Sequence, residues 1–248
     1  MILTRRALAL GSGLALAGCD SLIRDPKALA VAKSAEQATQ RWQRLIGRDA
    51  LAREFSAADI SPVFKANGTV APTSAAYQAH AASGFSDWRL KVSGLVERPL
   101  SLSVAQLQAL PARSQITRHD CVEGWSAIGG WAGPPLGLLL NAAGVRESAR
   151  YAVFLCADTY STSGVRYYES IDLIDAWHPQ TILALRLNNA PLDVAHGAPV
   201  RLRVERQLGY KHAKYIEEIV LAASLDGFGD GKGGYWEDRG SYEWYAGI

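Results

Sequence analysis

Short strands and short helices follow one another along this chain in no regular order, which limits the folds that it can adopt. Alternating apolar and polar residues predict half-buried strands at 88–94 and 200–204, and continuous apolar runs predict buried strands at 151–156 and 215–223. A parallel sheet joined by helices would repeat a strand–helix–strand unit, and the chain has no such repeat. We therefore expect an α+β fold. The other expected elements are a strand at 181–187, helices at 26–47, 104–110, 136–143 and 171–177, and a Gly- and Pro-rich turn at 129–135.

The length and composition fit a globular protein with a substantial core. Hydrophobic residues make up 48% and charged residues 20% of the 248 residues. The 26 basic residues exceed the 24 acidic ones by two, and Arg5 and Arg6, which we expect to be removed, account for that excess. A balanced mature chain does not suggest a polyanionic partner such as nucleic acid.

Residues 1–18 have the features of a lipoprotein export signal. Arg5 and Arg6 precede an apolar stretch of twelve residues, which is too short to cross a bilayer core of about 30 Å. Paired arginines are typical of the Tat route for folded proteins. The sequence ending in Cys19 resembles a bacterial lipobox, and Asp20 resembles a signal for retention at the inner membrane. We expect lipid on Cys19 and a periplasmic protein anchored to the inner membrane. The alternative is an ordinary signal peptide with an incidental cysteine.

The remaining chain divides into three expected parts. Residues 19–58 form a tether followed by the first helix, and residues 59–225 form the main domain. Residues 226–248 are rich in glycine and aromatic residues, and such a segment is too apolar to stay free in solvent. We expect this tail to pack on the main domain.

One cysteine lies among charged and imidazole side chains. Cys121 follows Arg118 and His119, and Glu123 comes two residues later. A thiol acts as a nucleophile or metal ligand only as the thiolate, and a neighbouring Arg or His lowers its pKa. These neighbours favour a chemical role, and the alternative is a small buried hydrophobic residue.

Cys121 and Cys156 are the two cysteines that remain if Cys19 carries lipid. In an exported protein the default expectation for such a pair is a disulfide. A bond between the Cys121 thiolate and a metal would exclude that disulfide, so the two expectations can be tested against each other.

A second segment, 196–214, concentrates positive charge beside a glycine. Strand alternation directs Arg201, Arg203 and Glu205 to the face opposite the apolar residues. Further cationic or imidazole residues follow the turn at Gly209: Lys211, His212 and Lys214. Cations gathered on one face suit an anionic, phosphate-bearing ligand. The alternative is a solvated charged strand with a Lys-rich loop.

Together the two segments resemble the oxidoreductases of the sulfite oxidase fold, which bind molybdenum through a pyranopterin (molybdopterin) dithiolene. A Cys121-Val-Glu-x-Trp-Ser block carries the resemblance, with a Gly-x-Pro-x-Arg block ending at Arg201 and a Gly-aromatic-Lys-x-x-Lys block ending at Lys214. The resemblance runs from about residue 60 to the C-terminus. It implies a sulfite-oxidase-type molybdopterin-binding fold with Mo-molybdopterin as the cofactor.

The resemblance also implies roles for individual residues. Cys121 inherits the role of thiolate ligand to molybdenum, since a soft thiolate suits this metal. Glu123 is expected beside the metal, where a carboxylate can orient a ligand or relay protons, and the alternative is a salt bridge to Arg118. The expected cofactor contacts are Asn67, Cys156, His196, Arg201, Lys211, His212 and Lys214.

The cysteine block also indicates a class of reaction. Sulfite oxidases hold their dianionic substrate with arginines, one of them five residues after the ligand cysteine, where this chain has Ser126. The block is more similar to that of bacterial reductases of methionine sulfoxide and related S-oxides. That similarity implies oxygen-atom transfer to or from a small S-oxide, N-oxide or sulfur oxyanion. The chain has no haem attachment motif and no iron–sulfur cysteine set, so the expected redox partner is a membrane cytochrome b or a periplasmic c-type cytochrome.

Two other functions fit the same residues. In the first, Cys121 is the nucleophile of a cysteine hydrolase, with His119 or His196 as the base. In the second, the chain is a non-enzymatic periplasmic lipoprotein whose basic face binds an anionic ligand. Molybdenum analysis would separate both from an oxidoreductase.

Overall fold

The computed structural model describes residues 25–160, 164–240 and 242–248. The expected signal peptide and the lipid site at Cys19 lie outside the described residues. The chain divides into two compact units, residues 1–50 and residues 51–248.

The described part of the first unit is a single helix, α2 (Pro26–Ile46), with a short extension. Asp25 caps the helix by accepting a hydrogen bond from Lys27 N (2.8 Å). Pro26 lies in the first turn, where its missing N–H leaves no hydrogen bond unmade. Among the described helices, none is both long enough and apolar enough to cross a bilayer.

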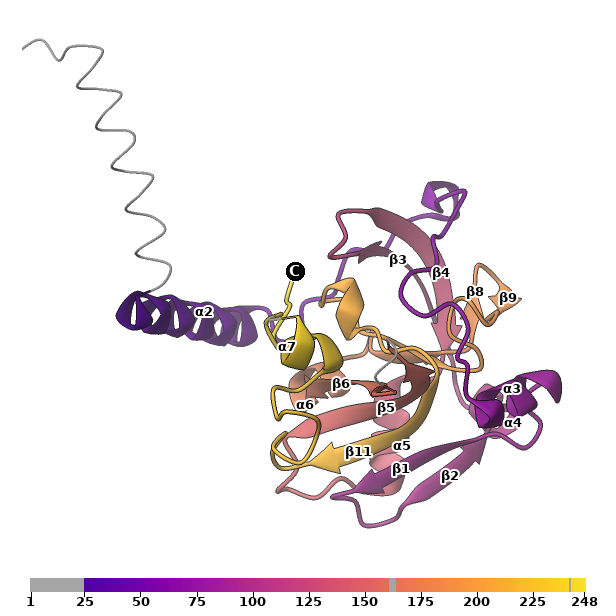
Figure 1. The fold of residues 1–248 in the computed structure, drawn as a ribbon. Helices are drawn as coiled ribbons and strands as arrows, with labels where there is room; N and C mark the ends of the chain where they lie inside the picture. Colours follow the sequence, from indigo (N-terminus) through magenta and orange to yellow (C-terminus); the bar gives the residue numbers. More distant parts are fainter. Residues whose placement is uncertain (1–24, 161–163, 241) are drawn as a thin grey trace, which may run out of the picture. The chain divides into compact units, whose positions relative to one another are not determined.

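The second unit is built on a mixed five-stranded sheet in the order β2–β1–β11–β5–β6 (Figure 1). β1 pairs with β11 in parallel, and the other neighbours are antiparallel. The parallel pair brings segments far apart in the sequence to the centre of the sheet. The strands are β1 (Arg89–Gly94), β2 (Leu100–Ser103), β5 (Tyr151–Thr159), β6 (Arg166–Asp172) and β11 (Ile216–Ala222).

Two further sheets complete this unit. A long hairpin of β3 (Arg113–Asp120) and β4 (Ser126–Gly133) continues through β8 (Arg186–Leu187) and β9 (Ala190–Pro191). Figure 1 shows this hairpin as a layer separate from the five-stranded sheet. The remaining elements are the strand pair β7 (Ile182–Ala184) and β10 (Arg201–Arg203), helices α3 (Ala75–Ala82), α4 (Val104–Gln108), α5 (Leu136–Ala143), α6 (Leu173–Ala176) and α7 (Tyr235–Arg239), and 3-10 turns η1 (Ala57–Asp59) and η2 (Gly209–Lys211). Mixed sheets with short helices confirm the expected α+β class.

The main hydrophobic core joins α5 to the five-stranded sheet. Leu136, Leu139 and Leu140 are buried in one cluster with Leu90 of β1 and Phe154 of β5. Their spacing of three and four residues places the leucines on one side of the helix. Burial of each such side chain contributes about 1.5–3 kcal/mol, so this contact is a major part of the stability of the unit.

The C-terminal segment, residues 226–248, packs on the same unit. Trp244 Nε1 donates to Ser170 Oγ on β6 (2.8 Å), and Ala246 N donates to Gln207 Oε1 (2.8 Å). Tyr235 of α7 belongs to the main core. The aromatic side chains of this segment are thereby buried or partly buried, whereas Ile248 at its end is exposed.

Two expected elements have other boundaries. The residues expected to form one strand at 181–187 form β7 and β8, which belong to different sheets. Of the expected helix at 171–177, only Leu173–Ala176 is α-helical. Ile171 and Asp172 instead continue β6, because they pair with the neighbouring strand β5.

The expected turn at 129–135 is wrong, because Gly129 to Gly133 lie in strand β4. Neighbouring segments lie very close to the backbone of β4 at these glycines. A Cβ atom on Gly133 would lie 1.9 Å from Leu183 O, and one on Gly129 would lie 2.9 Å from Phe64 Cδ2. These glycines therefore mark close packing and not a chain reversal.

Gly133→Ala should lower the free energy of unfolding by about 1–3 kcal/mol or prevent folding, because the new methyl group would meet backbone that cannot move aside. Gly227→Ala is the matched control, since a Cβ atom there meets nothing within 4 Å. Its effect should stay within about 0.5 kcal/mol. Equilibrium denaturation measures both changes, and equal stability of the two variants would contradict the close approach of β4 and β7.

Candidate functional site

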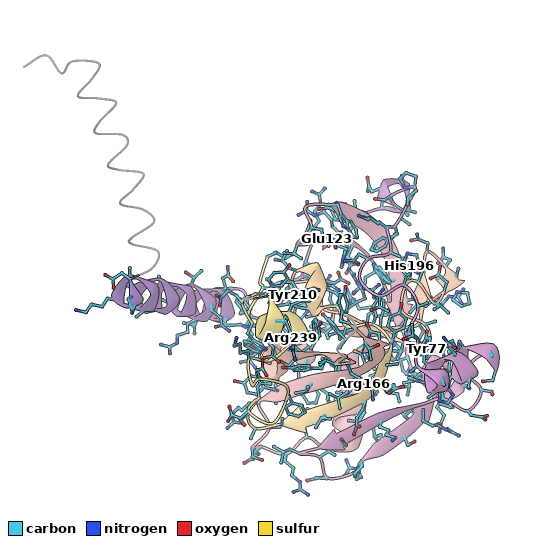
Figure 2. All side chains as sticks on the ribbon, in the orientation of Figure 1. Tyr77, Glu123, Arg166, His196, Tyr210 and Arg239 are labelled. Atoms are coloured by element: carbon cyan, nitrogen blue, oxygen red, sulfur yellow. The ribbon has the colours of Figure 1, made fainter. Side chains whose placement is uncertain are left out.

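One cavity gathers most of the residues expected to be functional. It is lined by residues from the loop before α3, the turn after β3, strands β5, β6 and β10, the η2 loop and the C-terminal segment. Glu123 and Tyr210, both labelled in Figure 2, lie on this lining. The expected site residues that it brings together are Asn67, Cys121, Glu123, Arg201, His212 and Lys214.

Cys121 lies in a tight turn directly after β3. Its N–H donates to Trp125 O (2.9 Å), and its carbonyl accepts from Gly124 N (3.0 Å). Gly124 has a φ of +85°, which glycine adopts without strain. Cys121 lines the cavity, where its Sγ accepts a hydrogen bond from Asn67 Nδ2 (3.2 Å). Cys121 and Cys156 are both free thiols, so the disulfide is not formed.

Burial raises the pKa of the Cys121 thiol. The expectation that Arg118 and His119 lower this pKa is wrong. Arg118 instead pairs with Asp120 (2.9 Å). His119 is neutral, because burial and the charge of Arg203 hold its pKa well below the usual range. The thiol therefore keeps its proton until a metal or another cation displaces it.

Arg201 and Arg203 of β10 are both buried but have different partners. Arg203 forms a bidentate ion pair with Glu205 (2.9 and 2.6 Å). The Arg201 guanidinium donates only to backbone, to His196 O (3.1 Å) and His212 O (3.5 Å), and its Nε has no partner among the described residues. The alternative of a solvated charged strand is therefore wrong.

The indole of Trp131 supports both guanidinium groups. Their central carbons lie 4.9 Å (Arg201) and 4.4 Å (Arg203) from a ring centroid, within the range of cation–π attraction. Burial, with a smaller contribution from Arg203, lowers the pKa of Arg201 to about 9, so the group stays charged at neutral pH. A buried cation that faces a cavity and pairs with no carboxylate among the described residues is a place for an anionic ligand.

Lys214 holds the loop that carries Asn67. Its ammonium group donates to three carbonyl oxygens, those of Asn67 (2.9 Å), Thr69 and Ala195 (3.0 Å). Burial and Arg201 lower the pKa of Lys214 to about 7, whereas the three carbonyl acceptors favour the charged form. All three ammonium protons are thus used to fix backbone around the cavity.

Three expected cofactor contacts lie away from the cavity lining: Cys156, His196 and Lys211. Lys211 is buried between the carboxyl groups of Glu169 and Glu237. Cys156 is 0% exposed and belongs to the main hydrophobic core. Lys211 stands within a family motif and Cys156 within an expected buried strand, and neither sequence position indicated these surroundings.

The two histidines considered as bases have other bonds. His119 Nδ1 lies 3.0 Å from an Arg203 guanidinium nitrogen, which can only donate. The ring nitrogens of His196 bond Asp193 Oδ1 (2.7 Å) and Phe64 O (2.9 Å), and its carbonyl accepts a hydrogen bond from Arg201 (3.1 Å). Among the described residues neither ring bonds the Cys121 sulfur, and a cysteine hydrolase therefore has no support.

Glu123 is half-exposed at the mouth of the cavity. Its carboxylate accepts from Trp125 Nε1 (3.2 Å) and lies 3.8 Å from Lys65 Nζ. The alternative of a salt bridge to Arg118 is wrong, because Arg118 pairs with Asp120. A carboxylate in this position can exchange protons with solvent.

Sequence analysis did not identify the aromatic wall of the cavity, formed by Tyr160, Tyr210, Trp236 and Tyr242. Their rings contact one another in a chain, with centroid distances of 5.1 Å, 5.7 Å and 5.0 Å. Asp158, also unidentified, lines the cavity. Its Oδ1 has no partner among the residues that the structure describes, and burial raises its pKa to about 6. The aromatic content of residues 226–248 was the only signal that could have indicated part of this wall.

Comparison with known proteins places the chain in a family. Residues 77–226 match the family described as oxidoreductase molybdopterin binding domain. A protein of Azospira oryzae named as protein-methionine-sulfoxide reductase subunit YedZ1 is 44% identical over 160 residues, which are 64% of this chain and 56% of that protein. The protein-methionine-sulfoxide reductase catalytic subunit MsrP of Xanthomonas campestris is 41% identical over 149 residues, which are 56% of this chain and 46% of that protein.

The chain spans about half the length of these relatives. The sulfane dehydrogenase SoxCD of Paracoccus pantotrophus shares the fold, with a TM-score of 0.50 and 24% identity over 56% of this chain and 39% of that chain. The family match extends over more than half of this chain. The chain therefore belongs to the oxidoreductases with a molybdopterin binding domain, and its cofactor is Mo-molybdopterin.

Proposed function

We propose that this protein reduces a small S-oxide such as methionine sulfoxide, with Cys121 as the protein ligand to molybdenum. The observation that carries the proposal is the pairing, in one cavity, of a buried free thiol with a buried guanidinium that has no carboxylate partner among the described residues. The names of the relatives from Azospira and Xanthomonas support the S-oxide as substrate class.

The chemistry of the donor groups fits the cofactor. Cys121 offers one soft sulfur to the metal, whose other sulfurs belong to the dithiolene. Arg201, whose Nε has no partner in the described part of the chain, suits an anionic phosphate. His212 Nε2 donates to Gln207 O (3.0 Å), so the neutral ring leaves Nδ1 as a buried acceptor, which suits an N–H group of the pterin. Lys214 and Asn67 would act by fixing the loop beside the thiol.

When bound, the cofactor supplies a metal that exchanges two electrons and accepts an oxygen atom. Overall, one S-oxide with two electrons and two protons gives one thioether and one water. Glu123, half-exposed at the mouth, would pass protons from solvent into the cavity. The aromatic wall would contact the sulfur and its apolar substituents. Ser126 Oγ donates a hydrogen bond to Asp120 Oδ1 (2.5 Å). Because this position is a serine, it supplies no arginine to hold a dianionic substrate.

Electron supply and location are further parts of the proposal. The chain lacks a haem attachment motif and an iron–sulfur cysteine set, so a membrane cytochrome b or a periplasmic c-type cytochrome would supply the electrons. Export directed by Arg5 and Arg6, followed by lipid attachment at Cys19, would hold the protein at the periplasmic face of the inner membrane. The N-terminal sequence supports this location.

Metal analysis and Cys121→Ser test the proposed function. Protein from a host that makes the cofactor should contain about one molybdenum per chain, and a chain without it would support the ligand-binding lipoprotein instead. Cys121→Ser should retain pterin and lose methionine sulfoxide reduction by roughly a hundredfold or more, since even groups that only support a metal ligand are worth 10–100-fold. Cys156→Ala is the matched control, and near-normal turnover in Cys121→Ser would remove Cys121 from the metal.

Arg201→Ala should lower cofactor retention more than it lowers stability. Loss of one charge-assisted contact to an anion costs about 1.5–3 kcal/mol, which weakens binding roughly ten- to a hundredfold. Pterin extracted per folded chain is the measurement, and Arg186→Ala, an exposed arginine on β8, is the control. Normal pterin content with reduced thermal stability alone would refute the role of Arg201.

Cys19→Ala should move the mature protein from the membrane fraction to the soluble periplasmic fraction. A single acyl chain binds a membrane only reversibly, and stable anchoring takes two such signals. Loss of the lipid groups on Cys19 should therefore release the protein. Fractionation measures the shift, and mass spectrometry of the mature terminus checks the modification. An unmodified terminus in the wild-type protein would contradict the lipid anchor.

A further inference from the structure

A buried ion cluster of Glu169, Lys211 and Glu237 lies beside the cavity. Lys211 Nζ donates to Glu237 Oε1 (2.7 Å) and to Glu169 Oε1, and the three residues are 0–2% exposed. None of the three lines the cavity. The ion cluster joins β6, the η2 loop and α7, which are remote in the sequence.

Each member of the ion cluster is within two positions in the sequence of a residue that lines the cavity. Strands and helical turns are stiff over one or two residues, so a displaced cluster member moves its neighbour as well. These neighbours are Tyr167 on β6, Tyr210 and His212 in the η2 loop, and Trp236 on α7.

The ion cluster contains two carboxyl groups and one ammonium group. Burial holds the pKa of Glu169 well above its usual range, although Lys211 opposes this shift. The Oε2 atoms of both glutamates have no partner among the described residues, and both face Gly234. A Cβ atom on Gly234 would lie 2.2 Å from Glu237 Oε2 and 2.6 Å from Glu169 Oε2. One proton held on these carboxyl groups leaves the ion cluster neutral overall.

The aromatic wall depends on this attachment. α7 has only five residues, too few for a stable isolated helix, so its place is set by tertiary contacts. Trp236 on α7 stacks on Tyr242, and Tyr242 contacts Tyr210 of the η2 loop. The bond from Lys211 to Glu237 joins the η2 loop to α7.

We propose that Glu169, Lys211 and Glu237 are positioning residues that hold the aromatic wall against the cavity and thereby set the affinity for the substrate. This inference rests on the proposed function, because the substrate is the S-oxide named there. Loss of the tie to α7 moves the wall away and weakens substrate binding. The residues around the thiol keep their places, because other segments carry them.

Three variants separate this role from a purely structural one. Glu237→Ala removes the tie to α7 but leaves Lys211 paired with Glu169, so no buried charge loses its partner. Glu237→Gln keeps an oxygen that can accept from Lys211 and likewise leaves the ion pair of Lys211 with Glu169 in place. Glu147→Ala, at an exposed glutamate after α5, is the matched control.

Steady-state kinetics of the molybdenum-loaded proteins, at a temperature where all are folded, measure the effect on the substrate. In Glu237→Ala we expect KM for methionine sulfoxide to rise about tenfold and kcat to stay within about threefold of wild type. Glu237→Gln and Glu147→Ala should keep the wild-type KM. A cluster with only a structural role would lower the melting temperature and leave KM unchanged, which would overturn the proposal.

Limited trypsin digestion of the same proteins tests the attachment without any turnover. Lys232 and Arg239 are exposed trypsin sites on either side of Glu237, and Figure 2 labels Arg239. Cleavage should be about tenfold faster in Glu237→Ala and unchanged in Glu237→Gln and the control. Unchanged cleavage in Glu237→Ala would overturn the attachment. A different outcome would separate the two proposals. If Glu237→Ala is cleaved faster but the molybdenum-loaded wild type itself has no turnover, the proposed function is overturned and the attachment is supported.

Discussion

The burial of two adjacent guanidinium groups is the constraint on which the cavity depends. Moving a charge out of water costs several kcal/mol, so each buried cation must be compensated. Glu205 compensates Arg203, and Gln115 Nε2 supports that carboxylate (2.9 Å). Within the described part of the chain, Arg201 donates hydrogen bonds to backbone carbonyls alone and lies over the face of Trp131. The fold therefore holds a positive charge in place before any anion binds, and the anion recovers part of the cost of its burial.

The other polar groups of the site are fixed by bonds between distant segments. Lys214 donates to the loop around Asn67, which lies 147 positions away in the sequence, and Asn67 in turn donates to Cys121. The Glu169–Lys211–Glu237 cluster does the same for the C-terminal segment. Since these groups are buried, each unmade bond would cost more than a surface bond contributes. Order in the cavity lining and stability of the fold thus rest on the same contacts.

Local patterns were sufficient to predict several elements, and the resemblance of two sequence blocks to a known family indicated the chemistry of the site. The helix expected at 136–143 has those bounds in the structure, because its apolar spacing and the closing Gly144 are local features. The strand at 88–94 likewise corresponds to β1. The family resemblance implied nine catalytic and cofactor residues, and six of them line one cavity.

The amino-acid sequence by itself determined which reactive groups the chain carries and the class of fold, since residue type, spacing and periodicity are properties of neighbours along the chain. Tertiary structure alone decided what surrounds each group. The glycines that suggested a turn lie in β4, where neighbouring segments approach the backbone closely. The pKa of Cys121 is raised because the effect of burial outweighs that of its sequence neighbours. Lys211, expected to bind the cofactor, is paired with Glu169, 42 positions away. Burial and charge pairing depend on residues that meet only in the folded chain, so no local pattern encodes them.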